Sequence, residues 1–351
     1  MTTFFPGPSK VRPELGQYLQ DAFTNGILSV SHRSETFNQL SEQTLQLLRQ
    51  KLAIPDSYTI LYTSSATECW EIISQSFTRK KAAHFSSGAF GDKWFQYAHA
   101  IHPASHKVPF HVTEELVADY MDVFEDDEMI CLTQNETSNG TQISFDTLSE
   151  IRGAHPNQLV ALDCTSSMAG INLPYILGDI WFASVQKCFG LPAGLGLLIL
   201  SPAAVQRARE INDTRYYNSA LTMIGHIEKF QTSCTPNVLG IYLLNRVLQD
   251  APRIEETDAL LRSRMARYIQ AAEGQNLHPL VSNDAVRSTT VLAVQADPEL
   301  IAGIKAEAKA EGMLLGSGYG TWKNDTFRIA NFPAYTDAEV DKLISFLKPR
   351  A

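Results

Sequence analysis

Short apolar runs alternate with amphipathic stretches along the first two thirds of the chain. The predicted strands span residues 58–62, 82–85, 129–133, 159–163, 180–185 and 194–200, and the predicted helix after the first of them spans residues 67–77. Strands that alternate with helices in this way are typical of an α/β domain. Because 159–163 and 180–185 are almost entirely apolar, they predict central strands of a mostly parallel sheet that is covered on both faces.

The pattern changes after residue 243. A long charged helical stretch over residues 254–273 is followed by an alternating strand at 288–294, a helix at 298–311, a strand at 326–329 and a helix at 337–347. This order predicts a smaller α+β unit. At roughly 150 residues per domain, 351 residues suit two domains. We therefore predict a large domain over residues 1–245 and a small C-terminal domain over residues 246–351.

Composition and charge narrow the classes of function. The chain has 29 Lys and Arg against 38 Asp and Glu, a formal net charge of −9, which argues against binding nucleic acid through bulk electrostatics. No apolar run approaches the ~20 residues of a membrane helix, and the first residues do not have the profile of a signal peptide. We expect a cytoplasmic protein that acts on small molecules, with no nucleic-acid partner and no membrane partner.

Cysteine and histidine spacing predicts neither a disulfide framework nor a metal site. The cysteines are odd in number and contain no Cys-x-x-Cys pair. They are Cys69, Cys131, Cys164, Cys188 and Cys234. His99, His102 and His106 have helical spacing, but Pro103 interrupts that helix and no nearby carboxylate completes a ligand set.

Two charged residues follow buried strands in the middle of the chain. Asp163 ends the run 159–163, and Lys187 follows the run 180–185. In α/β sheets, ligands bind at the carboxyl ends of the strands. A lysine in these apolar surroundings has a lowered pKa and an amine that can form a Schiff base. The alternative is a structural ion pair between Asp163 and Lys187.

The segment 63–68 (TSSATE) follows a strand and opens a helix. Backbone N–H groups and the hydroxyls of Ser64, Ser65 and Thr67 predict an anion site at the positive end of that helix. A capping box of Ser65 and Glu68 is compatible with the same pattern. Since neither a P-loop nor a G-x-G-x-x-G motif occurs, a phosphate-bearing cofactor held by the lysine fits better than a nucleotide.

Seven short motifs, in this order, give the chain a resemblance to a known family. They are residues 5–9 (FPGPS), 30–34 (VSHRS), 134–137 (QNET), 163–167 (DCTSS), 183–187 (ASVQK), 235–236 (TP) and 327–329 (FRI). In order and spacing, the chain resembles the class V, fold-type I aminotransferases that use pyridoxal phosphate, and within them the phosphoserine aminotransferases. The resemblance covers nearly the whole chain. It implies a fold-type I large domain with a mostly parallel sheet and a smaller α+β domain.

The resemblance also implies roles for individual residues. Lys187 would bond the cofactor, and Asp163 would keep its ring nitrogen protonated so that the ring accepts electrons. The other implied cofactor contacts are Thr137 at the ring hydroxyl, Phe90 on the ring face, Ala66, Thr67 and Gln186 at the phosphate, and Thr235 from a second subunit. Because Thr235 would come from a second subunit, the resemblance also implies a homodimer with shared active sites. Taken singly, Phe90 could be a core residue, 135–137 a turn and 235–236 a helix start.

For the substrate, the resemblance implies that Arg328 binds the α-carboxylate and that His32 and Arg33 bind the distal phosphate or γ-carboxylate. Arg33 alone could instead be a surface residue. The expected reaction is amino transfer between O-phospho-L-serine and 2-oxoglutarate, which would serve serine biosynthesis and also pyridoxine biosynthesis.

The chain departs from phosphoserine aminotransferases at three places. Thr67 stands where many of them have a basic residue, and Phe90 stands where tryptophan is usual. Residues 316–323 (GSGYGTWK) lack a His-Arg pair and are closer to alanine– or serine–glyoxylate aminotransferases. Lys323 could restore one charge. An aminotransferase of the alanine/serine–glyoxylate or serine–pyruvate type is therefore the alternative function.

Overall fold

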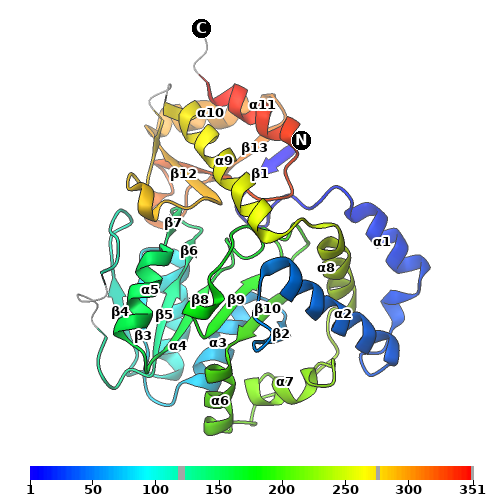
Figure 1. The fold of residues 1–351 in the computed structure, drawn as a ribbon. Coiled ribbons are helices and arrows are strands. Elements are labelled where there is room, and N and C mark those ends of the chain that lie inside the picture. Colours follow the sequence, from blue (N-terminus) through cyan, green and yellow to red (C-terminus); the bar gives the residue numbers. More distant parts are fainter. Residues whose placement is uncertain (118–122, 274–276, 349–351) are drawn as a thin grey trace.

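The computed structural model describes residues 1–117, 123–273 and 277–348. Two lobes are visible in Figure 1, a larger one built on a central sheet and a smaller one that carries the N-terminal strand and the C-terminal helices. In the described part of the chain, no helix is both long enough and apolar enough to cross a membrane.

The large lobe contains a seven-stranded sheet in the order β2-β10-β9-β8-β5-β3-β4. The strands are β2 (Thr59–Thr63), β3 (Ala83–Ser86), β4 (His106–Pro109), β5 (Met129–Thr133), β8 (Leu159–Asp163), β9 (Ile180–Ser184) and β10 (Gly196–Leu200). Only β10 runs against its neighbours, and the other pairings between adjacent strands are parallel. The predicted mostly parallel sheet is confirmed, with strand ends shifted by two residues at most.

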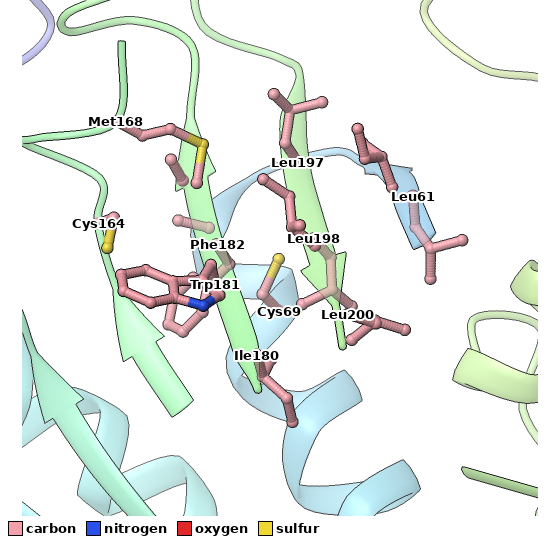
Figure 2. Packing of buried hydrophobic residues seen from close by; sticks show 14 of the residues in the cluster. Leu61, Cys69, Cys164, Met168, Ile180, Trp181, Phe182, Leu197, Leu198 and Leu200 are labelled. Carbon is pink, nitrogen blue, oxygen red and sulfur yellow. The ribbon is translucent and has the colours of Figure 1, made fainter. Parts of the chain in front are cut away.

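The centre of this sheet is buried on both faces. Every residue of β5, β8, β9 and β10 is buried, as expected for strands covered by helices on each side. Successive side chains of β9 point to opposite faces: Trp181 packs against Tyr175, and Phe182 packs edge-on against Trp94. Figure 2 shows this layer, in which Leu198 of β10 is the register partner of Phe182 of β9.

The small lobe contains a five-stranded sheet in the order β1-β13-β14-β12-β11. Its strands are β1 (Thr2–Phe4), β11 (His278–Pro279), β12 (Val291–Gln295), β13 (Met313–Ser317) and β14 (Thr326–Ala330). The first strand of the chain pairs in parallel with β13, so the N-terminus belongs to the sheet of the C-terminal region. A two-stranded hairpin of β6 (Asn135–Glu136) and β7 (Thr141–Gln142) follows β5.

Helices cover both sheets. They are α1 (Leu15–Thr24), α2 (Glu35–Leu52), α3 (Ala66–Phe77), α4 (Ala89–Ile101), α5 (Phe145–Ala154), α6 (Pro202–Ile211), α7 (Ala220–Ile227), α8 (Val238–Asp250), α9 (Ile254–Glu273), α10 (Pro298–Ala310) and α11 (Asp337–Leu347). Side-chain caps fix several starts, because a Ser, Thr or Asn oxygen accepts an N–H of the first turn. Ser65 caps α3 in this way, and Thr336 and Glu339 form a capping box at α11.

The division into domains at residue 245 stays a prediction. Two observations bear on where it would be drawn: α8 runs continuously through residue 245, and β1 belongs to the small sheet. Residues 235–236 do not start a helix, since α8 begins at Val238 with Asn237 as its cap. The alternative interpretation of that dipeptide as a helix start is therefore wrong.

One buried histidine predicts sensitivity to acid. His84 of β3 is 2% exposed, and neither ring nitrogen has a hydrogen-bond partner among the described residues. Its ring lies against Trp94 and Phe95. Burial, with a smaller contribution from His106, lowers the pKa of His84 to about 3. Below the unfolded pKa of about 6.5, the unfolded chain binds a proton that the folded chain rejects, so stability falls as the pH falls.

We expect the free energy of unfolding to decrease by about 2 kcal/mol between pH 6.5 and pH 5 through this group alone. Denaturant unfolding at both pH values measures it. His84→Phe should remove that part of the pH dependence, whereas the same change at the exposed His278 should retain it. Equal pH dependence in wild type and His84→Phe would contradict this assignment.

Candidate active site

A cavity lies where the carboxyl ends of β5, β8 and β9 face the small lobe. Both lobes and the N-terminal segment contribute to its wall. The lining residues are Pro6, Gly7, Pro8, Ala66, Thr67, Trp70, Phe90, Thr133, Asn135, Thr137, Asp163, Thr165, Ser184, Gln186, Lys187, Tyr319 and Arg328. Most of the residues singled out in the sequence thus meet in one place, at the strand ends where α/β folds bind ligands.

Lys187 lies in the loop after β9 and is 5% exposed. Its Nζ donates to Thr137 Oγ1 at 2.7 Å and to Ser166 Oγ at 2.9 Å. Burial lowers the pKa of Lys187 to about 8, and the negative charges of Asp163 and Glu136 oppose that shift. A far larger fraction of this amine than of an ordinary lysine is therefore neutral and nucleophilic near neutral pH.

Asp163 is the last residue of β8 and is 4% exposed. Its carboxylate accepts from Trp70 Nε1 at 3.3 Å and from the Thr165 N–H at 2.9 Å. Burial raises the pKa of Asp163, while the hydrogen bonds from Thr165 and the charge of Lys187 act against that rise. Among the ion pairs of the described residues none joins Asp163 to Lys187, so the structural ion pair considered as an alternative does not form.

The segment between β2 and α3 caps the helix with some of its residues and lines the cavity with others. Ser65 Oγ accepts the Glu68 N–H at 3.1 Å, and the Glu68 carboxylate turns back to the N–H and hydroxyl of Ser64. The Ser64 hydroxyl donates to Glu68, whereas the Ser65 hydroxyl keeps a proton for another acceptor. Neither serine lines the cavity, and an anion site at these hydroxyls stays a prediction. Ala66 and Thr67 face the cavity, together with Gln186 after β9.

Two aromatic rings and a guanidinium close the side of the cavity that faces the small lobe. Phe90, in the first turn of α4, lies with its ring centroid 5.3 Å from Lys187 Nζ, and Tyr319 stacks on it at 5.5 Å between centroids. Arg328 of β14 donates from Nε to Ser317 O and from Nη1 to Thr137 O, both at 2.8 Å. Burial lowers the pKa of Arg328 to about 10, and its Nη2 makes no hydrogen bond within the described residues. That edge is available to a carboxylate ligand.

The N-terminal segment crosses from the small sheet to Lys187. The Ser9 N–H donates to Gln186 O at 3.1 Å. At Gly7 a Cβ atom would lie 2.9 Å from Lys187 Cε, closer than real carbon atoms approach, so only glycine fits there. In the sequence, residues 5–9 carry only a resemblance, whereas the contacts with Lys187 and Gln186 give this segment a physical role in holding the lysine.

Three predicted site residues lie elsewhere in this subunit. Thr235 lines a different pocket, which it shares with Glu68, Tyr217 and other residues. Arg33 is exposed, and its Nη1 donates to Gln231 Oε1 at 2.7 Å and contacts His226 Nδ1 at 3.2 Å. His32, half-buried beside Arg33, is not part of the cavity wall either.

Trp70 and Tyr319 were not predicted as site residues. Trp70 lies one turn after Thr67 on α3, so helical spacing from Thr67 offered a signal. Tyr319 reaches the cavity from the connection between β13 and β14, and only the fold reveals that position.

The comparison with families of known proteins decides what this arrangement is. A family model described as "Aminotransferase class-V" matches residues 6–310. The chain belongs to the class-V aminotransferase family. It is therefore a transaminase, and the predicted family, fold class and enzyme class are confirmed.

Several class-V aminotransferases are similar over the full length. The phosphoserine aminotransferase of Corynebacterium glutamicum (strain R) is 29% identical over 347 residues, covering 96% of this chain and 91% of that one. A crystal structure of a phosphoserine aminotransferase from Cytophaga hutchinsonii ATCC 33406 superposes with a TM-score of 0.93 at 30% identity, covering 99% of this chain and 98% of that chain. An alanine–glyoxylate aminotransferase from a Nostoc species has the same fold, with a TM-score of 0.82 at 17% identity and coverage of 99% and 94%.

The cofactor of this class-V aminotransferase is pyridoxal phosphate. The residues that line the cavity fit it. A buried amine of lowered pKa suits its aldehyde, a buried carboxylate suits its ring nitrogen, and an aromatic face suits its ring. At the start of α3, Ala66 and Thr67 line the cavity, and the positive end of the helix favours the phosphate of the cofactor.

Proposed function

We propose that this transaminase is a phosphoserine aminotransferase, which transfers an amino group between O-phospho-L-serine and 2-oxoglutarate. In the biosynthetic direction it would convert 3-phosphohydroxypyruvate and glutamate to O-phospho-L-serine and 2-oxoglutarate. The observation that carries the proposal is the likeness to a solved phosphoserine aminotransferase along nearly the whole of both chains, at 30% identity and a TM-score of 0.93. The solved alanine–glyoxylate enzyme is more distant in both measures.

The proposed roles of the site residues follow from their positions in the cavity wall. Lys187 would bond the cofactor in the resting enzyme and, once the substrate amine has displaced it, would move a proton from the substrate Cα as general base and acid. Pyridoxal phosphate, when bound, accepts the electron pair of the broken Cα–H bond. Asp163 holds a proton on the ring nitrogen.

The remaining cavity residues bind and orient. The cofactor contacts proposed for them are Thr137 at the ring hydroxyl, Phe90 over the ring, and Ala66, Thr67 and Gln186 at the phosphate. Arg328 binds the α-carboxylate through the edge that carries Nη2, because its Nε and Nη1 already bond Ser317 O and Thr137 O.

A homodimer with shared active sites is part of the same proposal. His32, Arg33 and Thr235 lie outside the cavity of their own subunit, and Arg33 bonds Gln231, which lines the same pocket as Thr235. These residues thus share one surface. Exposed apolar side chains occur nearby in sequence on α1 and after it, at Phe23 (70% exposed) and Leu28 (52% exposed). We propose that this surface packs against a second copy and completes its cavity.

The physiological setting is proposed as well. The enzyme would act in the cytoplasm, where its five free cysteines stay reduced, and would supply phosphoserine for serine biosynthesis. A second role in pyridoxine biosynthesis is proposed from the same resemblance.

The alternative donor is alanine or serine, with glyoxylate or pyruvate as acceptor. It is favoured by the small number of cations in the cavity wall, where Lys187 and Arg328 are the charged bases among the described residues. Lys323, which could have restored a charge, is exposed and not part of the wall.

Amino-donor profiling separates the two functions. We expect O-phospho-L-serine with 2-oxoglutarate to give a kcat/KM at least ~100-fold above L-alanine with glyoxylate. Arg33→Ala should lower kcat/KM for phosphoserine roughly 10- to 100-fold, since hydrogen bonds to charged groups contribute about 1.5–3 kcal/mol. Turnover of alanine should stay unchanged, because alanine has no distal anion.

Lys323→Ala is the matched control for the loss of one positive charge, and it should leave both donors unaffected. No turnover of phosphoserine by the wild type would overturn the proposed substrate in favour of the glyoxylate-type enzyme. Equal effects of Arg33→Ala on both donors would overturn the role of Arg33 alone.

A further inference from the structure

Three consecutive residues after β5 connect the parts of the active site that lie on different elements. Glu136 and Ser138 face the start of α4, whereas Thr137 between them faces the cavity. Thr137 accepts from Lys187 through its hydroxyl and from Arg328 through its carbonyl. The segment 136–138 therefore contacts the helix of Phe90, the loop of Lys187 and the strand of Arg328.

Glu136 is 1% exposed, and its carboxylate is occupied by backbone donors. Oε2 accepts the N–H groups of Phe90 and Gly91, each at 3.1 Å, and Oε1 accepts the N–H of Ser138 at 2.9 Å. The residue before α4, Gly88, has no side chain to cap the helix. Glu136 supplies that cap from a distant strand, and Ser138 Oγ adds a bond from the Ala89 N–H at 3.1 Å.

Gly88 lies close against the side chains of Glu136 and Ser138, which leaves no room for a side chain at position 88. A Cβ atom on Gly88 would lie 2.5 Å from Glu136 Cγ and 2.6 Å from Ser138 Oγ. Any side chain there would push the carboxylate away from the first turn of α4. Phe90, whose ring faces Lys187 Nζ, lies in that turn.

The carboxylate also belongs to the charge balance around Lys187. The charged groups that act on the Lys187 amine are Asp163 from β8, Glu136 from β6 and Arg328 from β14. The neighbouring Cys188 stays a neutral thiol, because burial raises its pKa. Burial raises the pKa of Glu136, but three backbone N–H donors and the positive end of α4 favour the charged form. Its charge in turn raises the pKa of both Lys187 and Arg328.

We propose that Glu136 is a positioning residue of this active site: its carboxylate fixes the turn that carries Phe90, and its negative charge offsets the buried cations Lys187 and Arg328. Glu136 does not line the cavity, so it acts through its neighbours and not by contact with substrate. This role is independent of the amino donor and holds whether or not phosphoserine is the substrate.

The test is a pH titration of the visible absorption of the holoenzyme without substrate. Glu136→Gln keeps the size of the side chain and removes its charge. The lysine nitrogen bonded to the cofactor should then lose its proton at a pH about one unit lower, a roughly tenfold loss of proton affinity. Glu136→Asp, which keeps the charge, should titrate close to the wild type.

Ser138→Ala is the matched control, because it removes one hydrogen bond from the same turn without changing any charge. It should weaken the visible circular dichroism of the cofactor and leave the titration midpoint unchanged. A midpoint in Glu136→Gln equal to that of the wild type, or an equal shift in Ser138→Ala, overturns the proposal. If Glu136→Gln does not fold, a midpoint of Glu136→Asp shifted down by a full unit overturns it as well.

Discussion

Replacing Lys187 with alanine is expected to abolish transamination and to remove the visible absorption of the lysine-bound cofactor. The side chain is the buried amine of the cavity, with its pKa lowered to about 8 and its Nζ held by Thr137 and Ser166. It is proposed both to bond the cofactor and to move the Cα proton. Since a positioned general base contributes about 10²- to 10⁴-fold, we expect kcat to fall at least ~10³-fold.

Absorption spectra and kcat of the purified variant measure this effect. Cys188→Ala is the matched control: Cys188 is also buried and adjacent in sequence, but within the described part of the chain its Sγ bonds only the Ser166 carbonyl. It should keep the visible absorption and most of the activity. A Lys187→Ala protein that still turns over substrate at more than a tenth of the wild-type rate would assign the catalytic amine to another residue.

Asp163→Asn is expected to have the second-largest effect. An amide in place of the carboxylate cannot hold a proton on the cofactor ring nitrogen, so the ring accepts electrons less well. Removal of one partner of a buried charge pair costs about 3–5 kcal/mol, which corresponds to roughly 10²- to 10⁴-fold in kcat. We expect cofactor to remain bound to Lys187, so the loss should appear in kcat while visible absorption persists.

The control is Asp179→Asn, a second buried aspartate next to the same sheet. Asp179 accepts hydrogen bonds from Arg152, from the Val160 N–H and from Ser201 Oγ. It directly precedes β9, so it lies at the amino end of that strand, whereas the cavity lies at the carboxyl ends. Its replacement should lower the denaturation midpoint and leave kcat within about twofold. If the two variants lose kcat equally, Asp163 acts on folding and not on the cofactor.

The sequence predicts the central sheet well because its strands are buried on both faces. Runs such as Leu159–Asp163 have no competing periodicity, and the observed strand has the predicted bounds. The reversed direction of β10 has no local signal, since direction depends on which neighbours a strand meets. The sequence also gives no clear signal for strand β13, because Gly316 and Ser317 weaken its apolar pattern.

Within the site, residues at strand ends are predictable and residues on connections are not. Asp163 and Lys187 follow buried strands, and the topology of α/β sheets brings such positions together. The position of Tyr319 depends on how the small lobe sits over α4, and the capping role of Glu136 depends on a hairpin meeting a helix start. Neither the position of Tyr319 nor the cap by Glu136 produces a residue spacing that can be recognised in the sequence. The proposed site roles of His32, Arg33 and Thr235 would depend on a second copy of the chain, which the sequence of one chain does not place.

The pairing of the two ends of the chain has a consequence for biosynthesis. All strands of the large sheet lie between Thr59 and Leu200, so that sheet can assemble while the ribosome is still adding the C-terminal third. Strand β1 cannot join its sheet until β13 has been synthesised, because Thr2 pairs with Met313. The N-terminal segment that presses on Lys187 thus reaches its place only after β13 has been synthesised. A nascent chain stalled before β13 would present an incomplete cavity, and retention of the cofactor should begin only once β13 has emerged.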